Sequence, residues 1–393
     1  MTIAYTTAQV VIVGAGLNGA ATAFFLAERG ITDVVVIDRD YPGAGASSRG
    51  MGLLRTFHAN EPEAVLALKS LDVFTHWKER VGGSAGFRRT GFLWLDSAAR
   101  RDRLQKHVDM LRRIGSDSRL IDGAELAELQ PHLSVEDTIA VYEPNCGTAY
   151  GAKTNESLLA GAVARGVRLL TRTPALNLIA AGGKVTGVTT PLGEIHAEAV
   201  VLAAGAWSAP LARSIGIEIP VQARRLTIGR VMLPAEIKNP MTFLDGRFDT
   251  SFRPEDGATA LISMRDDRYG QTIEPDQRKE DVDPSAVASG IRRIRRRIPA
   301  AERFIGMNTW TGVDGFTPDY KGIYGAHHEC RNLFLIAGTN EKGFKVSPAV
   351  GMATAELIAT GRSPDIEKPE FSSARFANGA NVSGGEIGVD DLI

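Results

Sequence analysis

The stretch VVIVGAGLNGAATAFFLAERGITDVVVIDRD, residues 10–40, predicts a β-strand, an α-helix and a second β-strand in direct succession. The apolar run at 10–13 has the length and composition of a buried strand. A helix of small residues follows as far as Ala27, and Gly30 ends it. The apolar run at 34–37 then completes a βαβ unit, the building block of a sheet with parallel strands.

Three glycines in this unit, Gly14, Gly16 and Gly19, form the pattern G-x-G-x-x-G. In dinucleotide-binding folds the first makes a tight turn, the second lets backbone N–H groups approach a pyrophosphate, and the third lets helix and strand pack closely. The helix N-terminus adds partial positive charge, and Asp38 can accept hydrogen bonds from ribose hydroxyls. A glycine-rich turn without a ligand is the alternative. We favour a dinucleotide site because strand, helix, second strand and acid follow in the required order.

Length and composition limit the remaining possibilities. The 393 residues favour two domains over one, and 45 lysines and arginines against 46 aspartates and glutamates give no reason to expect nucleic-acid or anionic-membrane binding. Two cysteines, Cys146 and Cys330, are too few for a disulfide framework and suit a reducing compartment. Neither a membrane-spanning run nor a signal peptide is evident. We therefore expect a soluble cytoplasmic protein.

Three further segments indicate which dinucleotide binds. The loop YPGAGASSRGMGLLRT, residues 41–56, is rich in small residues, which suits backbone passing close to a second part of a long cofactor. Residues 194–208, EIHAEAVVLAAGAWS, contain a buried strand and a glycine turn. Residues 332–361 contain another strand and turn, followed by a helix whose N-terminus can stabilise negative charge. The loop and the C-terminal turn have no role in an NAD-dependent dehydrogenase, so these segments favour FAD over NAD.

Four motifs carry a resemblance to a known family: GAGLNG, ASSRGMGLLR, VVLAAGAWS and GTNEKGFKVSPAVG, in that order. The chain resembles the D-amino-acid oxidase superfamily of FAD-dependent oxidoreductases, and its sarcosine oxidase-like branch, from Val10 to about Gly361. The resemblance implies an α/β protein with a Rossmann-like FAD-binding domain assembled from discontinuous segments. It also implies an α+β substrate domain, in which a large mixed or antiparallel sheet covers the flavin.

On this basis the chain divides into two discontinuous domains. We expect residues 1–85, 145–220 and 325–375 to form the FAD-binding domain. Residues 86–144 and 221–324 are then expected to form the substrate-binding domain.

Local patterns predict elements inside these segments. Residues 100–114 and 123–129 have helical patterns, and 221–262 contains runs that alternate as strands do. The basic run IRRIRRRIP, residues 291–299, places its isoleucines at helical spacing, which favours a solvated helix face over a nucleic-acid site. The Gly- and Asn-rich end, residues 377–393, is expected to be a mobile tail.

The motifs and the positions beside them supply the residues expected to contact FAD. These are Gly14, Gly16, Leu17, Asn18, Gly19, Asp38, Arg39, Ser47, Ser48, Arg49, Gly50, Gly52, Leu53, Ala175, Ala204, Gly205, Trp207, Gly338, Asn340, Gly343, Phe344 and Lys345. The resemblance places a flavin-tethering cysteine of some relatives at about Gly312, and a tethering histidine of others in the loop that here carries Arg49. Because neither residue type stands there, we expect FAD to be held noncovalently.

Two cations, Arg55 in GLLRT and Lys345 in the expected turn GFKVSP, are catalytic and substrate-binding candidates. In the sarcosine oxidases that these stretches resemble, the matching arginine and lysine bind the substrate carboxylate. A planar guanidinium can pair with both carboxylate oxygens, and a lysine adds a point charge. The alternative is that both are solvated surface charges. Their position inside cofactor-loop motifs favours a site.

The oxygen site departs from the family pattern. The resemblance implies a lysine that the corresponding stretch, LISMRDD at residues 261–267, lacks. Ser263 or Met264 takes its place, and Arg265 is the candidate for supplying the charge. Without that charge, reaction with O2 would be slow, and the enzyme would behave as a dehydrogenase with another electron acceptor.

Other titratable residues are weaker candidates. Asp267 and Asp314 are placed near the expected flavin face and are candidates for contacting the substrate. The pair His327–His328 lacks the other ligands of a metal site, so we expect no metal.

These observations predict an FAD-dependent oxidation of the C–N bond of a small carboxylated amine, such as a secondary, N-methyl or cyclic amino acid. Hydride transfer to flavin N5 would give an imine, and the protein would mainly orient the substrate. Oxidation of a 2-hydroxy acid on the same fold is an alternative. A flavin-bearing subunit of a multi-chain dehydrogenase, with a partner subunit, is another.

Overall fold

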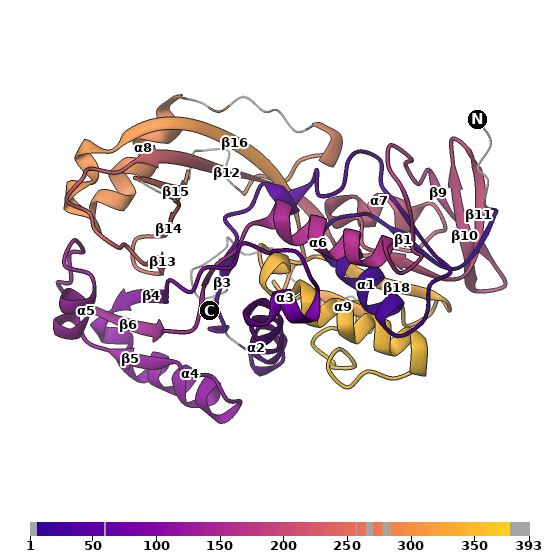
Figure 1. The fold of residues 1–393 in the computed structure, drawn as a ribbon, viewed down its shortest axis with the longest axis horizontal. Helices are drawn as coiled ribbons and strands as arrows, with labels where there is room; N and C mark the ends of the chain where they lie inside the picture. The colour runs from indigo at the N-terminus through magenta and orange to yellow at the C-terminus, as the bar shows by residue number, and fades with distance from the viewer. Residues whose placement is uncertain are drawn as a thin grey trace.

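The structure is a computed structural model, and it describes residues 6–58, 60–256, 258–264, 270–277, 282 and 284–377. Two eight-stranded sheets lie at opposite ends of the long axis of the molecule, and two long strands of the second sheet reach toward the first (Figure 1). One sheet is rich in parallel pairs and the other is mostly antiparallel. The predicted fold class, an α/β unit beside a unit with a large mixed or antiparallel sheet, is confirmed.

The first sheet is built around the strand of the opening motif. Its strands are β1 (Thr7–Val13), β2 (Val34–Ile37), β8 (Arg168–Leu170), β9 (Asn177–Ala181), β10 (Lys184–Thr190), β11 (Gly193–Leu202), β17 (Ile323–Ala326) and β18 (Leu333–Ala337). They follow the order β17-β18-β11-β1-β2-β8, and β10 and β9 add to β11. The pairs from β18 to β8 are all parallel. The carboxyl ends of five strands therefore meet at one edge.

The helices of this half pack on the sheet or on one another, and small residues let some of them approach closely. The helices are α1 (Leu17–Glu28), α2 (Glu61–Thr75), α3 (Trp77–Arg80), α6 (Gly151–Val163), α7 (Ser208–Arg213) and α9 (Gly343–Thr360). A Cβ added to Gly351 of α9 would lie 2.5 Å from the Cβ of Ala21 in α1, so only glycine permits this helix contact. The close packing brings α9 beside α1, and residues at both N-termini line the same cavity.

A helix covers the face of the second sheet that points away from the first sheet. The strands of the second sheet are β4 (Phe92–Ser97), β5 (Arg119–Ile121), β6 (Thr138–Glu143), β12 (Gln222–Met232), β13 (Thr242–Asp245), β14 (Thr250–Pro254), β15 (Thr259–Ser263) and β16 (Ile305–Phe316). They follow the order β16-β12-β15-β14-β13-β4-β6-β5, antiparallel except for β13 beside β4. Val231, Phe252 and Ile262 pack against Ile294 of α8 (Pro284–Arg295) or its neighbours. Side chains at the alternate positions along these strands point to the other face, toward the first sheet.

The remaining described elements connect or flank the two sheets. They are α4 (Arg101–Arg113), α5 (Gly123–Leu129), the strands β3 (Leu53–Leu54) and β7 (Gly147–Thr148), and the 3-10 turns η1 (Ala46–Ser48), η2 (Ala98–Arg100), η3 (Gly205–Trp207), η4 (Pro275–Gln277), η5 (Pro299–Arg303) and η6 (Ser373–Phe376). The helices predicted at 100–114 and 123–129 are confirmed as α4 and α5. The basic run at 291–299 is only partly helical, because α8 ends at Arg295. Ile294 is buried on the helix, whereas Arg297 beyond its end is buried and paired with Asp245 at 2.6 Å instead of facing solvent.

One local prediction was wrong. The stretch GFKVSP, expected as a turn, forms the start of α9 from Gly343 onward. Pro348 lacks the N–H that would bond to the carbonyl of Phe344, and the hydroxyl of Ser347 donates to that carbonyl at 3.0 Å instead. The helix therefore continues through the proline. Apart from Ala377, the expected tail at 377–393 lies outside the described residues.

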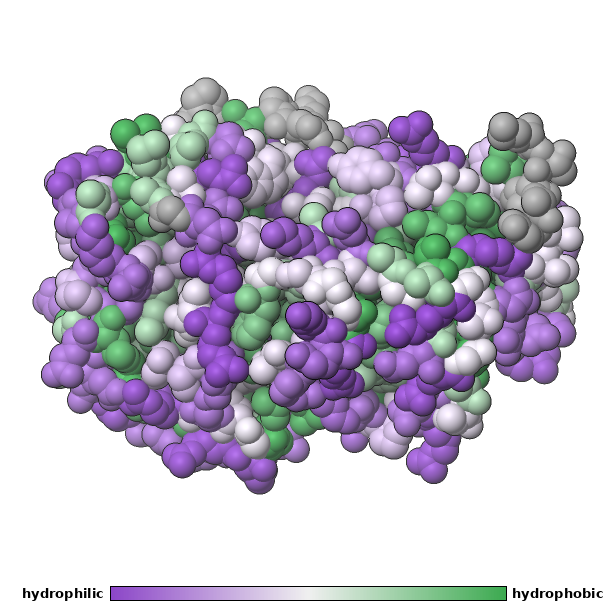
Figure 2. Space-filling model, viewed as in Figure 1, coloured by the Kyte–Doolittle hydropathy of each residue, from purple (hydrophilic) through white to green (hydrophobic). Residues whose placement is uncertain are grey.

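No described helix is both long and apolar enough to cross a bilayer. On the face drawn in Figure 2, hydrophilic residues cover most of the surface and hydrophobic residues form separate small groups among them. The exposed large apolar side chains are Tyr41, Val163, Leu176, Met232, Ile305 and Met307.

Candidate active site

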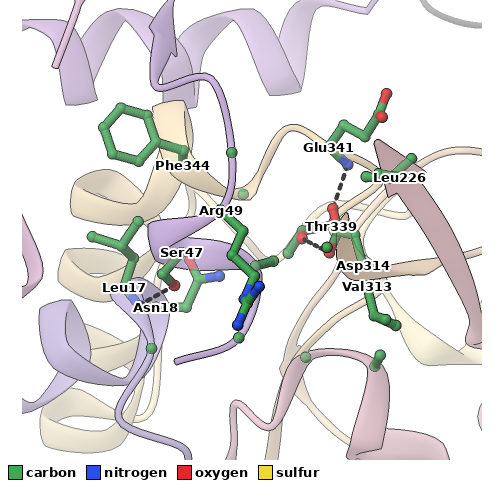
Figure 3. A pocket seen from close by; sticks show the side chains of 18 of the residues that line it. Leu17, Asn18, Ser47, Arg49, Leu226, Val313, Asp314, Thr339, Glu341 and Phe344 are labelled. Carbon is green, nitrogen blue, oxygen red and sulfur yellow. Dashed lines mark hydrogen bonds between the residues drawn. The ribbon is translucent and has the colours of Figure 1, made fainter. Parts of the chain in front are cut away.

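A cavity of about 710 Å³ lies between the two sheets. It opens at the carboxyl ends of β1, β2 and β11, where Gly14, Asp38 and Ala203 line it, and extends to the inner face of the second sheet. In open α/β sheets this edge is where ligands bind. Figure 3 shows side chains from both halves of the chain converging on the cavity.

The first end of the cavity is formed by the opening motif. Gly14 has φ +105°, and a Cβ there would lie 2.5 Å from the carbonyl oxygen of Ala203. A Cβ on Gly19 would lie 1.9 Å from the carbonyl oxygen of Gly14, so this glycine serves helix–strand packing. The N–H of Leu17 donates to Ser47 Oγ at 3.0 Å, which ties the loop to the helix N-terminus (Figure 3). Gly14 thus lies in a tight turn, and Gly19 lies where helix and strand pack closely.

Asp38 organises the same end. Its carboxylate accepts the N–H of Ala15 at 2.8 Å and the N–H of Asp40 at 2.9 Å. Burial raises the pKa of the Asp38 carboxyl, and these two hydrogen bonds act in the opposite direction. The side chain therefore braces the turn after β1 while still lining the cavity.

At the outer opening of the cavity, side chains from the two parts of the molecule contact one another. Arg39 Nη1 lies 2.6 Å from Asp276 Oδ1, and Trp207 Nε1 donates to the same oxygen at 2.8 Å. The guanidinium of Arg39 lies 5.2 Å from the centre of the Trp207 ring. Asp276 belongs to η4, which follows a segment paired with β12 through the N–H of Ile273 and the carbonyl of Ala223. Asp276 was not among the expected contacts.

The loop after β2 reaches the middle of the cavity. Arg49 donates to the carbonyls of Ala44 at 3.3 Å and Thr311 at 3.1 Å, and its own carbonyl accepts Trp310 Nε1 at 2.9 Å. Gly312 lines the cavity beside it. These bonds fasten the loop to β16 of the second sheet.

The turn after β18 is held by Asp314. Its carboxylate accepts the N–H of Glu341 at 2.7 Å, the N–H of Gly315 at 2.8 Å and the hydroxyl of Thr339 at 3.3 Å, and Figure 3 shows the first and third of these contacts. Burial raises the pKa of Asp314 to about 6. Asn340 and Glu341 adopt positive φ values of 52° and 61°, an unfavourable conformation that these side-chain contacts maintain.

Arg55 marks the substrate end. It follows β3, lines the cavity and is only 5% exposed, yet its Nε and Nη1 have no hydrogen-bond partner among the described residues. Burial lowers its pKa to about 10, so the guanidinium remains charged at neutral pH. The nearest aromatic contact is Trp94, whose ring centre lies 6.0 Å away. A buried, charged guanidinium with two unpartnered nitrogens calls for an anionic ligand.

Lys345 lies at the same end, in the first turn of α9. It is 6% exposed, and its Nζ donates to the carbonyl of Glu341 at 3.1 Å. Burial and the charges of Arg55 and Lys342 hold the pKa of Lys345 well below its usual value. The structure thus brings together the two cations that the sequence placed 290 positions apart.

A buried ion pair lies behind them. Lys342 Nζ lies 2.7 Å from both carboxylate oxygens of Glu63 and donates to the carbonyl of Tyr320 at 2.6 Å. His58 Nδ1 is 3.9 Å from Glu63, and burial together with three nearby cations holds the pKa of His58 well below its usual value. Sequence reasoning missed Glu63, Lys342 and His58. The sequence offers no signal for this pair, because Glu63 and Lys342 are 279 positions apart.

The inner face of the second sheet covers the substrate end with a largely apolar roof, here Trp94, Leu226, Ile228 and Leu244. Strand pairing aligns Trp94 with Leu244 and Ile228 with Ser263. The roof carries two hydroxyls, since Ser251 and Ser263 also line the cavity, and Ser263 Oγ accepts the N–H of Ser251 at 3.2 Å. The resemblance implied a sheet over the flavin, but the sequence did not identify which of its side chains form this roof.

The other expected residues fall in three groups. Most line the cavity, but Gly19, Ser48 and Gly338 do not. Gly19 faces β1, Ser48 is exposed, and Gly338 packs against Thr317 with φ +61°. Arg265 and Asp267 lie outside the described residues.

At the expected oxygen position the two candidates point differently. Ser263 lines the cavity, whereas Met264 is buried on the other face, where a Cβ on Gly229 would meet it at 1.9 Å. Cys146 and Cys330 are buried, free thiols and neither lines the cavity. In the described part of the chain, no group of three or more His, Cys, Asp or Glu residues is arranged to hold a metal ion.

Comparisons with known proteins agree with this geometry. The profile described as FAD dependent oxidoreductase matches residues 9–357. Glycine oxidase of Geobacillus kaustophilus is 28% identical over 97% of this chain and 99% of its own length, and a crystal structure of glycine oxidase from that organism aligns with a TM-score of 0.80, 26% identity and coverage of 91% and 96% of the two chains.

Two further similarities differ in extent. L-proline dehydrogenase from P. horikoshii shares the fold with a TM-score of 0.86 at 23% identity, covering 95% of this chain and 99% of that one. Human mitochondrial sarcosine dehydrogenase is 26% identical over 94% of this chain, which spans only 42% of its length. With the family profile covering nearly the whole chain, this protein belongs to the FAD dependent oxidoreductases of the D-amino-acid oxidase superfamily.

Proposed function

We propose that this protein oxidises the C–N bond of a small carboxylated amine, such as a secondary, N-methyl or cyclic amino acid, with noncovalently bound FAD. The observation that carries the proposal is Arg55, a buried and charged guanidinium with unpartnered Nε and Nη1 at the end of the cavity. A carboxylate is the ligand that its planar donor fork fits. An amine without a carboxylate would leave this charge unpaired.

The residues present fit FAD. The helix N-terminus at Leu17 offers partial positive charge for a pyrophosphate, and Gly14 and Gly16 line the cavity beside it without side chains. Asp38, Arg39 and Trp207 would hold the adenosine end, and Arg49 and Phe344 the flavin end. Once bound, FAD supplies the acceptor for two electrons and the hydrogen of the oxidised carbon. Gly312, which cannot form a tether, supports noncovalent binding.

The chain's own contribution is orientation. Arg55 would fix the carboxylate from one side and Lys345 would add charge from α9. The roof of Trp94, Leu226, Ile228 and Leu244 would exclude water and limit the size of the substituent on the substrate. The names of the similar proteins, glycine oxidase, sarcosine dehydrogenase and L-proline dehydrogenase, denote small amino acids and support this substrate class.

The electron acceptor is either O2 or another carrier. Ser263 at the cavity, in place of a lysine, favours slow reaction with O2. A partner subunit is a further possibility, because sarcosine oxidase subunit beta of Arthrobacter sp. is 26% identical over 94% of this chain and 91% of its own length. Co-purification of a second chain would support that arrangement.

The test is an anaerobic titration of the purified yellow protein with N-methyl, cyclic and primary amino acids and with 2-hydroxy acids. We expect amines bearing a carboxylate to bleach the flavin absorbance. Bleaching by hydroxy acids alone would overturn the proposal. Admitting air then distinguishes an oxidase, which recolours rapidly, from a dehydrogenase, and acid precipitation should release all flavin into the supernatant if FAD is noncovalent.

A further inference from the structure

At the substrate end, four basic groups lie together, and most of them have no hydrogen-bonded carboxylate among the described residues. We define the basic cluster as Arg55, His58, Lys342 and Lys345, all of which are at most 8% exposed. Within the described residues, Lys342 is the one member with a carboxylate at hydrogen-bond distance, that of Glu63. The Nζ of Lys345 contacts a neutral backbone carbonyl.

Two unpaired cations in one dehydrated site are costly, and the two side chains respond differently. An unpaired buried charge is usually removed by a change of protonation state. Arginine does not lose its proton under such conditions, whereas a buried lysine does so readily. On this argument Arg55 keeps its charge, and Lys345 is the group that gives up its proton more readily in the free protein. The lowered pKa of Lys345, caused by burial and by Arg55 and Lys342, agrees with this assignment.

The arriving substrate carries the complementary proton. An amine beside a carboxylate is mostly protonated near neutral pH, since amino groups have pKa values of about 8 to 10. An ammonium cannot give up a hydride from the neighbouring carbon until its nitrogen lone pair is free. The carboxylate, once it lies against Arg55, supplies the negative charge that Lys345 lacked and raises the pKa of Lys345.

We propose that Lys345 accepts the ammonium proton of the substrate as the carboxylate docks against Arg55, so that substrate recognition and amine activation are one event. This inference rests on the proposed function. One N–H bond of the ammonium breaks, one N–H bond forms at Lys345 Nζ, and the substrate changes from a zwitterion to an amine carboxylate. No electrons are transferred in this step, so it needs no oxidant.

The neighbouring groups are less suited to accept that proton. Both oxygens of Asp314 accept hydrogen bonds in the turn after β18. The carboxylate of Glu63 is paired with Lys342 and also accepts from Asn60 Nδ2 at 2.9 Å. His58 is buried beside the charges of Arg55 and Lys342, which oppose its protonation, and it does not line the cavity.

Charged groups from each packed element act on Lys345. Arg55 after β3 and Lys342 before α9 lower its pKa, while Glu341 in the preceding turn and Glu63 of α2 raise it. Binding a carboxylate adds one negative charge to this set. The resulting proton uptake is therefore a direct signature of the inference.

The first experiment measures protons bound together with a ligand that has a carboxylate and no amine. The holoenzyme is titrated with cyclopentanecarboxylate in weakly buffered solution containing a pH indicator, and binding is followed by the flavin spectrum. We expect uptake to approach one proton per ligand at a pH between the lowered pKa of Lys345 in the free protein and its raised pKa in the complex. Lys345→Met and Lys345→Arg should show no uptake. A Lys69→Arg variant, altered in the exposed pair with Asp365, should behave as the wild type.

The outcomes separate the two proposals. Binding without proton uptake in the wild type would overturn the role of Lys345 and leave the proposed function intact. If neither this carboxylate nor any carboxylated amine perturbs or bleaches the flavin, the proposed function fails and the inference fails with it. Unchanged proton uptake in both Lys345 variants would assign the proton to another group and also overturn the inference.

A second readout uses the amine itself. In Lys345→Arg the cation is retained but cannot accept a proton, so the amine must lose its proton to solvent. The efficiency of anaerobic bleaching should then rise about tenfold per pH unit below the pKa of the free amine. The wild type should show a nearly flat profile over the same interval, because proton loss and uptake cancel. Identical profiles would contradict the inference.

Discussion

The cofactor end and the substrate end of the cavity differ in how their polar groups are satisfied. At the cofactor end, protein groups bond to one another: Asp38 accepts the N–H of Ala15, and Ser47 accepts that of Leu17. At the substrate end, and among the described residues, Arg55 has two unpartnered nitrogens and Lys345 Nζ donates to a backbone carbonyl. A cofactor that stays bound is held by a preformed cradle, whereas a substrate that comes and goes must supply the missing charge itself.

The largest effect is expected at the cofactor end, in the backbone turn at Gly14. Gly14→Ala puts a methyl group 2.5 Å from the carbonyl of Ala203 at φ +105°, so the turn must move away from the pyrophosphate. We expect FAD affinity to fall by about a thousandfold or more, roughly 4 kcal/mol. Gly30→Ala is the control, since Gly30 has φ +84° and open space around it. Equal flavin content in the two variants would contradict a preformed cradle.

The support behind the substrate end is tested by Glu63→Gln. The change leaves Lys342 buried without its carboxylate, and removing one member of a buried ion pair costs about 3–5 kcal/mol. Denaturant unfolding of the holoprotein should show this loss. Asp365→Asn, which breaks the exposed pair with Lys69, should cost less than about 1 kcal/mol. Similar losses in the two variants would show that the buried pair has no special role.

The sequence predicted the cofactor end of the cavity more completely than the substrate end. The cofactor end follows from local patterns, because G-x-G-x-x-G and the end of the second strand lie within one βαβ unit. Arg55 and Lys345 came from motif resemblance, while Glu63 and Lys342 meet across 279 positions and leave no periodic signal. Trp94 looked like any core residue, because its role depends on which face of β4 turns inward. Pairings between distant segments are set by packing, and a single sequence does not report them.

The carboxyl group between the two ends should make stability depend on pH. The pKa of Asp314 is about 6 in the folded protein against 3.8 for a free side chain, so the folded state holds its proton more tightly. Below about pH 4 the Asp314 carboxyl is protonated in both the folded and the unfolded state, so it does not change the free energy of unfolding. As the pH rises from about 4 to 6, the unfolded state loses this proton first, and the free energy of unfolding falls by up to about 3 kcal/mol. Asp314→Asn should flatten that part of the melting profile. An unchanged slope would contradict the raised pKa.

The smallest effect is expected at the outer opening of the cavity. Asp276→Asn weakens the link to Arg39 and Trp207, and such exposed pairs contribute about 1 kcal/mol or less. FAD should dissociate about two- to fivefold faster, as followed by recovery of flavin fluorescence after dilution. Asp365→Asn serves again as the control. If the rate does not change, η4 is not part of the cofactor site.

The most direct test of the account concerns Arg55. The best amine found by flavin bleaching is compared with its counterpart lacking the carboxylate, in the wild type and in Arg55→Met. We expect the wild type to prefer the carboxylated amine by about 100-fold or more, since truncating one member of a buried charge pair costs several kcal/mol. In Arg55→Met that preference should largely disappear while FAD content stays unchanged. A preference that survives the substitution would contradict a substrate carboxylate bound at Arg55.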